Sequence, residues 1–194
     1  FSNVHYLSAF HSNDEVTSEP GSGNFAFYHG SLGIGENNEA ALFLIERVFN
    51  DIDVPLKIAG SNASKELKDA VAQYENVELL EGISIEEIMA LMKAAHLNVL
   101  PTFQATGIKL KLLFALYNGR HCLCNSGMAS NTGLEELVTI ADDPADLKME
   151  VKRLMELPFD AAEIEKRKEV LERDMSNRRN AQRIIELLES QHFE

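Results

Sequence analysis

Several polar and cationic side chains follow one apolar stretch near the middle of the chain, and their types suit phosphate binding. The apolar stretch covers residues 97–100, and the candidates after it are Thr102, Gln104, Thr106, Gly107, Ile108, Lys109 and Lys111. The residues from Lys109 onward are apolar at helical spacing, so the N–H groups of Gly107 and Ile108 would face an anion at a helix N-terminus. Lys109 and Lys111 are expected in the first turn of this helix, where a cation is unfavourable unless an anion lies nearby.

A glycine-rich turn provides a second candidate for phosphate binding. Residues 25–29 (FAFYH) predict a buried strand, and the turn that leads from it toward a helix over 36–50 contains Gly30, Ser31, Leu32 and Gly33. A strand, a glycine turn and a helix in this order are the right context for a phosphate loop, but neither G-x-G-x-x-G nor G-x-x-x-x-G-K-[ST] follows the strand. His29 ends the strand, and it is either a site residue or a hydrogen-bonded strand-end histidine.

Strand and helix patterns alternate along the chain, which predicts a parallel sheet. Further strands are expected over residues 55–59, 77–80, 97–100, 120–124 and 138–141, with helices between them. This alternation is typical of βαβ units with right-handed crossovers. We therefore expect an α/β fold, a Rossmann-like three-layer α/β/α arrangement with about six parallel strands. Ligands of such sheets bind at the carboxyl ends of the strands, so Gly60 and Gly82, which close two strands, are further candidates.

Helix ends and domain limits follow from capping residues and composition. Ser84 and Glu87 form a capping box, and Asn62 or Ser61 could cap the helix that precedes Tyr74. Residues 1–24 predict a short strand over 4–10 and then an interdomain linker, residues 25–158 the main domain, and residues 159–194 C-terminal helices that break near residues 176–177. The final helix has a broad apolar face made of Ile184, Ile185, Leu187 and Leu188.

The charge and the cysteine content exclude several classes of function. A net charge of −13 gives no long-range attraction to nucleic acid or anionic lipid. Cys122 and Cys124 are two residues apart on a predicted strand, where a disulfide or a metal site with His121 is not expected, and a reduced, cytoplasmic setting is. No apolar run reaches the length of a membrane span. No catalytic triad is recognisable from residue types alone.

The order of the motifs resembles a known family. The resemblance covers residues 25–188, and no single motif in it is specific. The matching segments are Tyr28-His29-Gly30-Ser31-Leu32, Leu56-Lys57-Ile58-Ala59-Gly60, residues 76–82, Ala95-His96-Leu97-Asn98-Val99-Leu100-Pro101, and Thr106-Gly107-x-Lys109 through Gly119-Arg120. As an ordered set they resemble the C-terminal, nucleotide-sugar-binding domain of GT-B glycosyltransferases of the family-four, glycosyl transferases group 1 class.

This resemblance implies one half of a two-domain enzyme. The C-terminal domain of such an enzyme holds a nucleotide-diphosphate sugar, and a missing N-terminal domain would hold an acceptor glycan or a lipid-linked sugar. Transfer of a glycosyl group would serve surface polysaccharide or glycolipid synthesis, in the cytoplasm or peripherally at the membrane through the missing domain. The nucleotide sugar is a substrate, so no cofactor and no metal are expected, and the fragment alone should be inactive. The last helix would pack toward the N-terminal domain.

Departures from the family pattern leave other functions open. Many members carry an Arg and a Lys in the first loop, whereas residues 31–38 contain no basic residue. The positions of two family glutamates correspond to Thr106 and Phe114, so these positions supply no carboxylate for the donor's ribose. In place of the missing Arg and Lys, Lys109 or Lys111 would have to contact the phosphates. One alternative is a non-catalytic GT-B-like module for binding or assembly. Another is a nucleotide-sugar epimerase of the same architecture.

Overall fold

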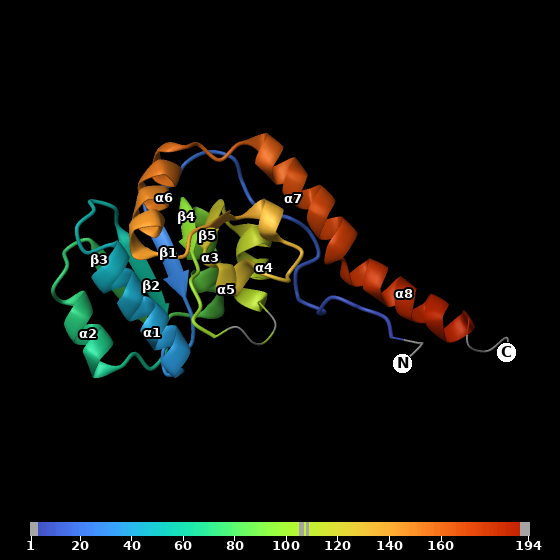
Figure 1. Cartoon of the computed structure of the whole chain (residues 1–194), viewed down its shortest axis with the longest axis horizontal. Helices are drawn as coiled ribbons and strands as arrows, with labels where there is room; N and C mark the ends of the chain where they lie inside the picture. The colour runs from blue at the N-terminus through green and yellow to red at the C-terminus, as the bar shows by residue number, and fades with distance from the viewer. Residues whose placement is uncertain (1–3, 105–106, 108, 191–194) are drawn as a thin grey trace.

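The computed structural model describes residues 4–104, 107 and 109–190, and they form an α/β fold with one six-stranded sheet (Figure 1). The strands are β1 (Ala26–His29), β2 (Leu56–Gly60), β3 (Val77–Glu81), β4 (Leu97–Val99), β5 (His121–Cys124) and β6 (Thr139–Ile140). Their order in the sheet is β3-β2-β1-β4-β5-β6, and every pair is parallel. The Rossmann-like prediction of about six parallel strands is confirmed.

Helices cover both faces of the sheet. They are α1 (Gly35–Phe43), which continues as the π-helical turn η1 (Leu44–Val48), α2 (Lys65–Val71), α3 (Ile85–Ala94), α4 (Leu110–Asn118), the short α5 (Ser126–Ala129), the 3₁₀ turn η2 (Glu135–Leu137) and α6 (Pro144–Glu156). The crossover from β1 to β2 and the crossover from β4 to β5 run in opposite directions along the sheet. Because such connections are right-handed, their helices α1 and α4 lie on opposite faces. Accordingly α1 contacts α2 while α3 contacts α4.

The strands are buried because both faces of the sheet are covered. Phe27, Tyr28, Ile58, Val99 and Leu123 are fully buried in the core. The strand order reverses between β1 and β4, and in open sheets such a switch point opens a crevice at the carboxyl ends of the strands. We call the two loops that meet there the first loop (residues 30–34) and the central loop (residues 100–109).

Several predicted helix boundaries are confirmed and others are wrong. The capping box of Ser84 and Glu87 is present. The cap of α2 is Ser64, whose hydroxyl accepts from the Leu67 N–H, and not Asn62 or Ser61. Asn62 instead adopts a positive φ of 58°, a turn conformation that asparagine tolerates and that comes before the helix. Lys109 is the N-cap residue of α4 and lies just outside its first turn, whereas Lys111 lies within it.

The predicted strand over residues 4–10 is wrong. The described part of this segment, from Val4, forms no strand and pairs through side chains instead. Ser8 accepts from the Asn180 amide at 2.7 Å, and Asn177 donates to the His11 carbonyl at 2.6 Å. The segment runs beside the last helix, as Figure 1 shows. Side-chain amides of that helix donate to the backbone carbonyl groups of the segment, which takes the place of strand pairing.

Two C-terminal helices follow α6, as predicted, and they are α7 (Ala161–Asp174) and α8 (Asn177–Ser190). A buried arginine, Arg167, fixes α7 to the sheet domain. Its guanidinium donates to Ser18 Oγ at 3.2 Å, Leu116 O at 3.3 Å and Gly119 O at 2.6 Å, and also to Arg120 O. Because these carbonyls end α4, a cation there also matches the negative end of the helix dipole. On α8, Ile185 and Leu188 remain exposed.

His96 is structural, as the apolar sequence around it indicates. It is fully buried, and its Nδ1 accepts a hydrogen bond of 3.0 Å from the Gly23 N–H. Its Nε2 must then carry the proton, which it donates to Leu154 O at 2.9 Å and Leu157 O at 3.1 Å. One imidazole thus joins the start of β1, the start of β4 and the end of α6.

Candidate functional site at the switch point

Lys111 is the cation at the centre of the switch point. Its Nζ donates to Asn37 Oδ1 at 2.9 Å and to Tyr28 OH at 3.3 Å, and it lies 4.6 Å from the centre of the Tyr28 ring. Burial lowers the pKa of Lys111 to about 8, while the Glu36 carboxylate nearby opposes that shift. Lys111 is therefore mostly protonated at pH 7, and one of its three N–H donors has no partner among the described residues.

A carboxylate from the first turn of α1 joins the two loops. Glu36 accepts a short hydrogen bond from the Thr102 hydroxyl, which links α1 to the central loop. Thr102 is held in turn by Asn125, whose amide donates to Thr102 O at 2.7 Å while its Oδ1 accepts from Thr102 N at 3.1 Å. Thr102, Glu36 and Lys111 thus bring β1, β4 and α4 together at one edge of the sheet.

Two further candidates of the central loop, Gly107 and Lys109, lie next to a pocket. Lys109 Nζ also donates to the carbonyl of the exposed Gln104 at 2.9 Å, so it ties two parts of the loop together. Gly107 adopts a positive φ of 89°, a conformation that glycine allows freely. A cavity of about 400 Å³ adjoins both residues, and its wall also includes Ser8, Leu113, Ser130, Asn131 and Thr132. Thr106 and Ile108 lie outside the described residues.

The first loop is already hydrogen-bonded within the protein. The Gly30 N–H donates to Ala59 O at 3.0 Å and the Gly33 N–H to Ser61 O at 3.1 Å. These two N–H groups thus already have acceptors, one in β2 and one in Ser61 just after it, and their role in phosphate binding stays a prediction. Ser31 is exposed, and its carbonyl accepts from Asn37 Nδ2 at 3.1 Å. Leu32 is buried, and it packs against the position of Gly60.

Gly60 and Gly82 have different places in the sheet. A Cβ at Gly60 would overlap the carbonyl oxygen of Gly30 and lie 2.8 Å from Leu32 Cγ, so glycine is what lets the first loop approach β2. Gly82 follows the edge strand β3 with a φ of 71°, two strands away from the switch point. The structure thus groups Gly60 with the first loop and separates Gly82 from the rest.

Sequence reasoning missed Tyr28 and Asn37, which contact Lys111, and Glu36, which bonds to Thr102. Tyr28 belongs to a buried strand, as predicted, and its burial raises the pKa of its hydroxyl. Asn37 binds Lys111 through its side chain. The signal that could have found them is positional, since Tyr28 lies near the carboxyl end of β1 and Glu36 and Asn37 open the helix that follows.

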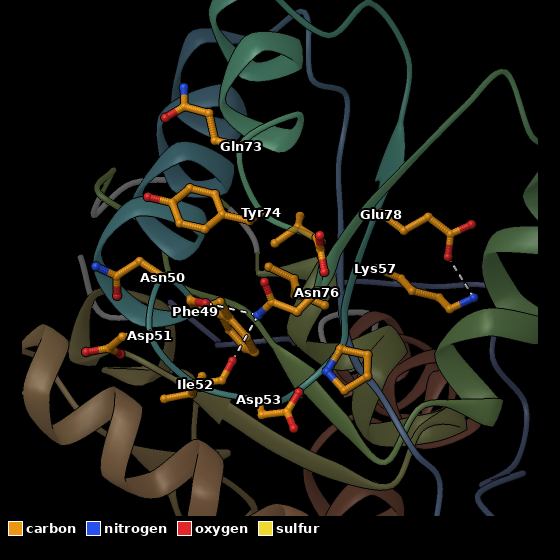
Figure 2. A pocket seen from close by; sticks show the side chains of 14 residues that line it. Phe49, Asn50, Asp51, Ile52, Asp53, Lys57, Gln73, Tyr74, Asn76 and Glu78 are labelled. Carbon is orange, nitrogen blue, oxygen red and sulfur yellow. Dashed lines mark hydrogen bonds and ion pairs between the residues drawn. The ribbon is translucent and has the colours of Figure 1, made fainter.

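Another cavity, of about 670 Å³, lies at the opposite edge of the sheet, where β2 and β3 begin. Figure 2 shows the Asn76 side chain pointing at the carbonyl groups of Phe49 and Ile52, to each of which it donates at 3.0 Å. Lys57 pairs with Glu78 at 2.9 Å on the same wall. Asn76, Lys57 and Glu78 on this wall thus have partners within the protein. Ligands of open α/β sheets bind at the opposite edge, where the strands end.

The remaining reactive groups form no site in the part of the chain that the structure describes. Cys122 and Cys124 are both buried free thiols, and burial raises the pKa of Cys122 to about 12. The described histidine, cysteine and acidic side chains include no group of three that could hold a metal ion. Among the same residues, no helix is both long enough and apolar enough to cross a bilayer.

The family comparison agrees with the fold and with the resemblance in the motifs. Residues 24–157 match the model of the family described as glycosyl transferases group 1. The chain belongs to this family. The match includes the whole sheet and ends before α7, so the two loops at the switch point lie within it. A search of curated proteins finds no match for the sequence.

Solved glycosyltransferases of the GT-B type have the same fold. A UDP-forming α,α-trehalose-phosphate synthase from Burkholderia xenovorans matches 82% of this chain and 41% of its own, with a TM-score of 0.59 and 12% identity. A variant of S. aureus TarM in complex with fondaparinux, α-GlcNAc-glycerol and UDP matches 93% and 38%, with a TM-score of 0.62 and 12% identity. AviGT4, involved in avilamycin A biosynthesis, matches 89% and 52%, with a TM-score of 0.54 and 19% identity.

This chain therefore spans about two fifths to one half of the length of these proteins. The coverage agrees with the expectation that the chain corresponds to one half of a GT-B fold. At such low identity the likeness concerns the fold alone, and the chemistry has to be inferred from this chain's own residues.

Proposed function

We propose that the chain is the donor-binding half of a glycosyltransferase and that it binds a nucleotide-diphosphate sugar at the switch point. Within the full-length protein, it would act with an N-terminal domain that binds an acceptor glycan or a lipid-linked sugar. The fragment alone would bind the nucleotide without turnover, because the acceptor half is missing. Membership of the glycosyl transferases group 1 family supports glycosyl transfer in general.

The observation that carries this proposal is the inward position of Lys111. An acidic chain has placed an ammonium group in the interior, at the edge of the sheet where α/β folds bind ligands. A lysine in such a place loses hydration, and its lowered pKa records that cost. A bound diphosphate would offset the cost by accepting the remaining N–H of the ammonium group, and the N-terminus of α4 would add its dipole.

In this proposal, the chemical role of Lys111 is to stabilise charge. When the bond between the sugar and the diphosphate breaks, negative charge develops on the leaving phosphate. An ammonium group fixed beforehand by Asn37 and Tyr28 stabilises that charge without reorganising. The complex of TarM with UDP supports a nucleoside diphosphate as the ligand of this fold. We propose no metal or other cofactor for this step, a cytoplasmic location, and a role in polysaccharide or glycolipid synthesis.

Calorimetric titration with UDP, GDP and ADP tests the proposal. We expect one of them to bind, and Lys111→Met to weaken that binding by about 10- to 100-fold, as for the loss of a charge-assisted hydrogen bond. Lys93→Met is the matched control, because Lys93 is a surface lysine on α3 that pairs with Glu19. Binding that is unchanged in Lys111→Met would contradict the proposed role of this residue.

A non-catalytic binding module is the second candidate, and Glu36 favours it. Its carboxylate bonds to Thr102 and lies near enough to Lys111 to neutralise part of the positive charge there, and the first loop supplies no basic residue. No heat with any of the three nucleotides, together with a protein partner that binds at α8, would select the module. An epimerase of the same architecture would bind the same nucleotides, and only the full-length protein can distinguish it from a transferase.

A further inference from the structure

His29, the last residue of β1, has an unusual hydrogen-bonding state. Its Nε2 is buried and has no partner in the described part of the chain. The other ring nitrogen, Nδ1, is not among the buried unpaired atoms and has no described partner either, so it reaches solvent. The ring stacks on Phe27, with 5.7 Å between the ring centres and 19° between the planes. The packing thus turns one nitrogen inward and the other outward.

This geometry selects the position of the proton on the ring. A buried N–H without an acceptor is rarer and more costly than a buried acceptor without a donor. The favoured neutral tautomer therefore leaves Nε2 as a bare acceptor in the interior and carries the proton on Nδ1. Burial and the nearby Lys111 lower the pKa of His29 to about 3, so the ring is neutral at pH 7. His29 then presents one uncharged N–H donor to the outside.

The donor lies where the proposed ligand would bind. β1 is one of the two strands at the switch point, and Gly30, which follows His29, begins the first loop. Lys111 on α4 is close enough to influence the ring electrostatically. A neutral donor beside a cation suits an oxygen acceptor, since the cation attracts negative charge and the N–H fixes its direction.

We propose that His29 donates a hydrogen bond from Nδ1 to an oxygen of the bound nucleotide sugar, either a phosphate oxygen or a sugar hydroxyl. This inference rests on the proposed function. It assigns His29 as a binding residue that selects an oxygen acceptor, next to a first loop whose Gly30 and Gly33 N–H groups already donate to Ala59 and Ser61. The hydrogen bond needs no change of charge on the ring, so it should persist throughout the neutral pH range.

Three variants separate the two ring nitrogens. His29→Phe keeps the aromatic packing on Phe27 and removes both nitrogens. His29→Asn places an amide near the position of Nδ1, whereas His29→Gln places its amide near the position of Nε2. We expect His29→Phe to weaken binding about 3- to 10-fold, the usual effect of one neutral hydrogen bond. His29→Asn should recover most of this loss, and His29→Gln should not.

The ligands for this titration are whichever of UDP, GDP or ADP binds the wild-type chain, and the glucose derivative of the same nucleotide. Equal weakening of both ligands by His29→Phe places the acceptor oxygen on the diphosphate. Weakening of the glucose derivative alone places it on the sugar. Nitrogen-15 spectra of the His29 ring in the free protein provide a readout that is independent of the ligand. They should show the proton on Nδ1 throughout the range from about pH 5.5 to about pH 8.

Two results would overturn the inference while leaving the proposed function intact. One is a ring proton on Nε2, and the other is a His29→Phe variant that binds both ligands as tightly as the wild type while Lys111→Met loses binding. A wild-type chain that binds none of the nucleotides would reject the proposed function, and this inference with it.

Discussion

The ammonium group of Lys111 on α4 lies 4.6 Å from the centre of the Tyr28 ring on β1. This contact crosses the switch point, because α4 follows β4 while Tyr28 belongs to the neighbouring strand β1. An aromatic face attracts a desolvated cation, and Tyr28 is fully buried. The contact holds the ammonium group at one point of the crevice, which is what a site for a diphosphate requires.

The first prediction is that nucleotide affinity falls at alkaline pH. Only protonated Lys111 attracts the diphosphate, and its pKa is lowered to about 8. Between pH 7 and pH 9.5 the dissociation constant should rise by at least about tenfold, as the ammonium loses its proton. Calorimetry at four pH values measures this, with Lys111→Arg as the control, since a guanidinium remains charged throughout. Equal pH dependence in both proteins would exclude Lys111 as the titrating group.

The second prediction concerns acid stability. The pKa of His29 is about 3 in the folded protein, below the ordinary value of about 6.5 that applies after unfolding. The unfolded state therefore binds the proton first as the pH falls below 6.5, and the folded state loses stability. At pH 5 this loss is about 2 kcal/mol relative to pH 7.

Urea denaturation at pH 7, 6 and 5 checks this prediction. The His29→Asn variant lacks the titrating ring and should lose about 2 kcal/mol less than the wild type over the same interval. Other groups, such as His121, titrate in both proteins and cancel in the difference. Parallel stability curves for the two proteins would show that His29 does not carry the effect.

The third prediction is that Arg167→Met destabilises the protein strongly. The guanidinium is fully buried, and the variant would leave carbonyl groups at the end of α4 without a donor. We expect a loss of about 3 kcal/mol or more in the free energy of unfolding. Arg173→Met on the same helix removes only exposed ion pairs with Asp174 and Glu136, so it should cost less than about 1 kcal/mol. Urea denaturation compares the free energies of unfolding of the two variants. Similar losses in both would contradict the structural role that we assign to the buried Arg167 guanidinium.

The fourth prediction concerns the close approach of the first loop and β2. Gly60→Ala places a methyl group against Gly30 O and Leu32 Cγ, so it should destabilise the fold by about 3 kcal/mol. Gly35→Ala is the control, because nothing lies within 4 Å of a Cβ at that position, and alanine in a helix stabilises by about 0.5–1 kcal/mol. Thermal unfolding of both variants measures the difference. A Gly60→Ala variant as stable as the wild type would disprove the overlap.

The fold was predictable because its signals are local and repeated. Apolar strands alternate with amphipathic helices, and the spacing of Ser84 and Glu87 specifies a helix start through two reciprocal hydrogen bonds. The segment over 4–10 misled because its alternating pattern resembles a strand, whereas tertiary partners such as Asn180 determine its conformation. The cap of α2 was misplaced because Asn62, Ser61 and Ser64 are all good capping residues.

The site was only partly predictable. Sequence position alone placed Thr102 and Lys111 beside the switch point, because both follow β4. It could not show that Glu36 bonds to Thr102 or that Asn37 holds Lys111, since these pairs are 66 and 74 residues apart in sequence. Nor could it show that the Gly30 and Gly33 N–H groups donate to Ala59 and Ser61, because that depends on how closely the first loop packs against the end of β2.

His96 has a consequence for synthesis of the protein on the ribosome. When β6 has emerged, all six strands are available for folding, but Leu154 and Leu157, which accept the His96 proton, are still inside the ribosomal exit tunnel. Until they emerge, the nascent sheet carries an imidazole N–H without its native acceptor in its interior. Completion of α6 is therefore the event that allows this half of the molecule to mature.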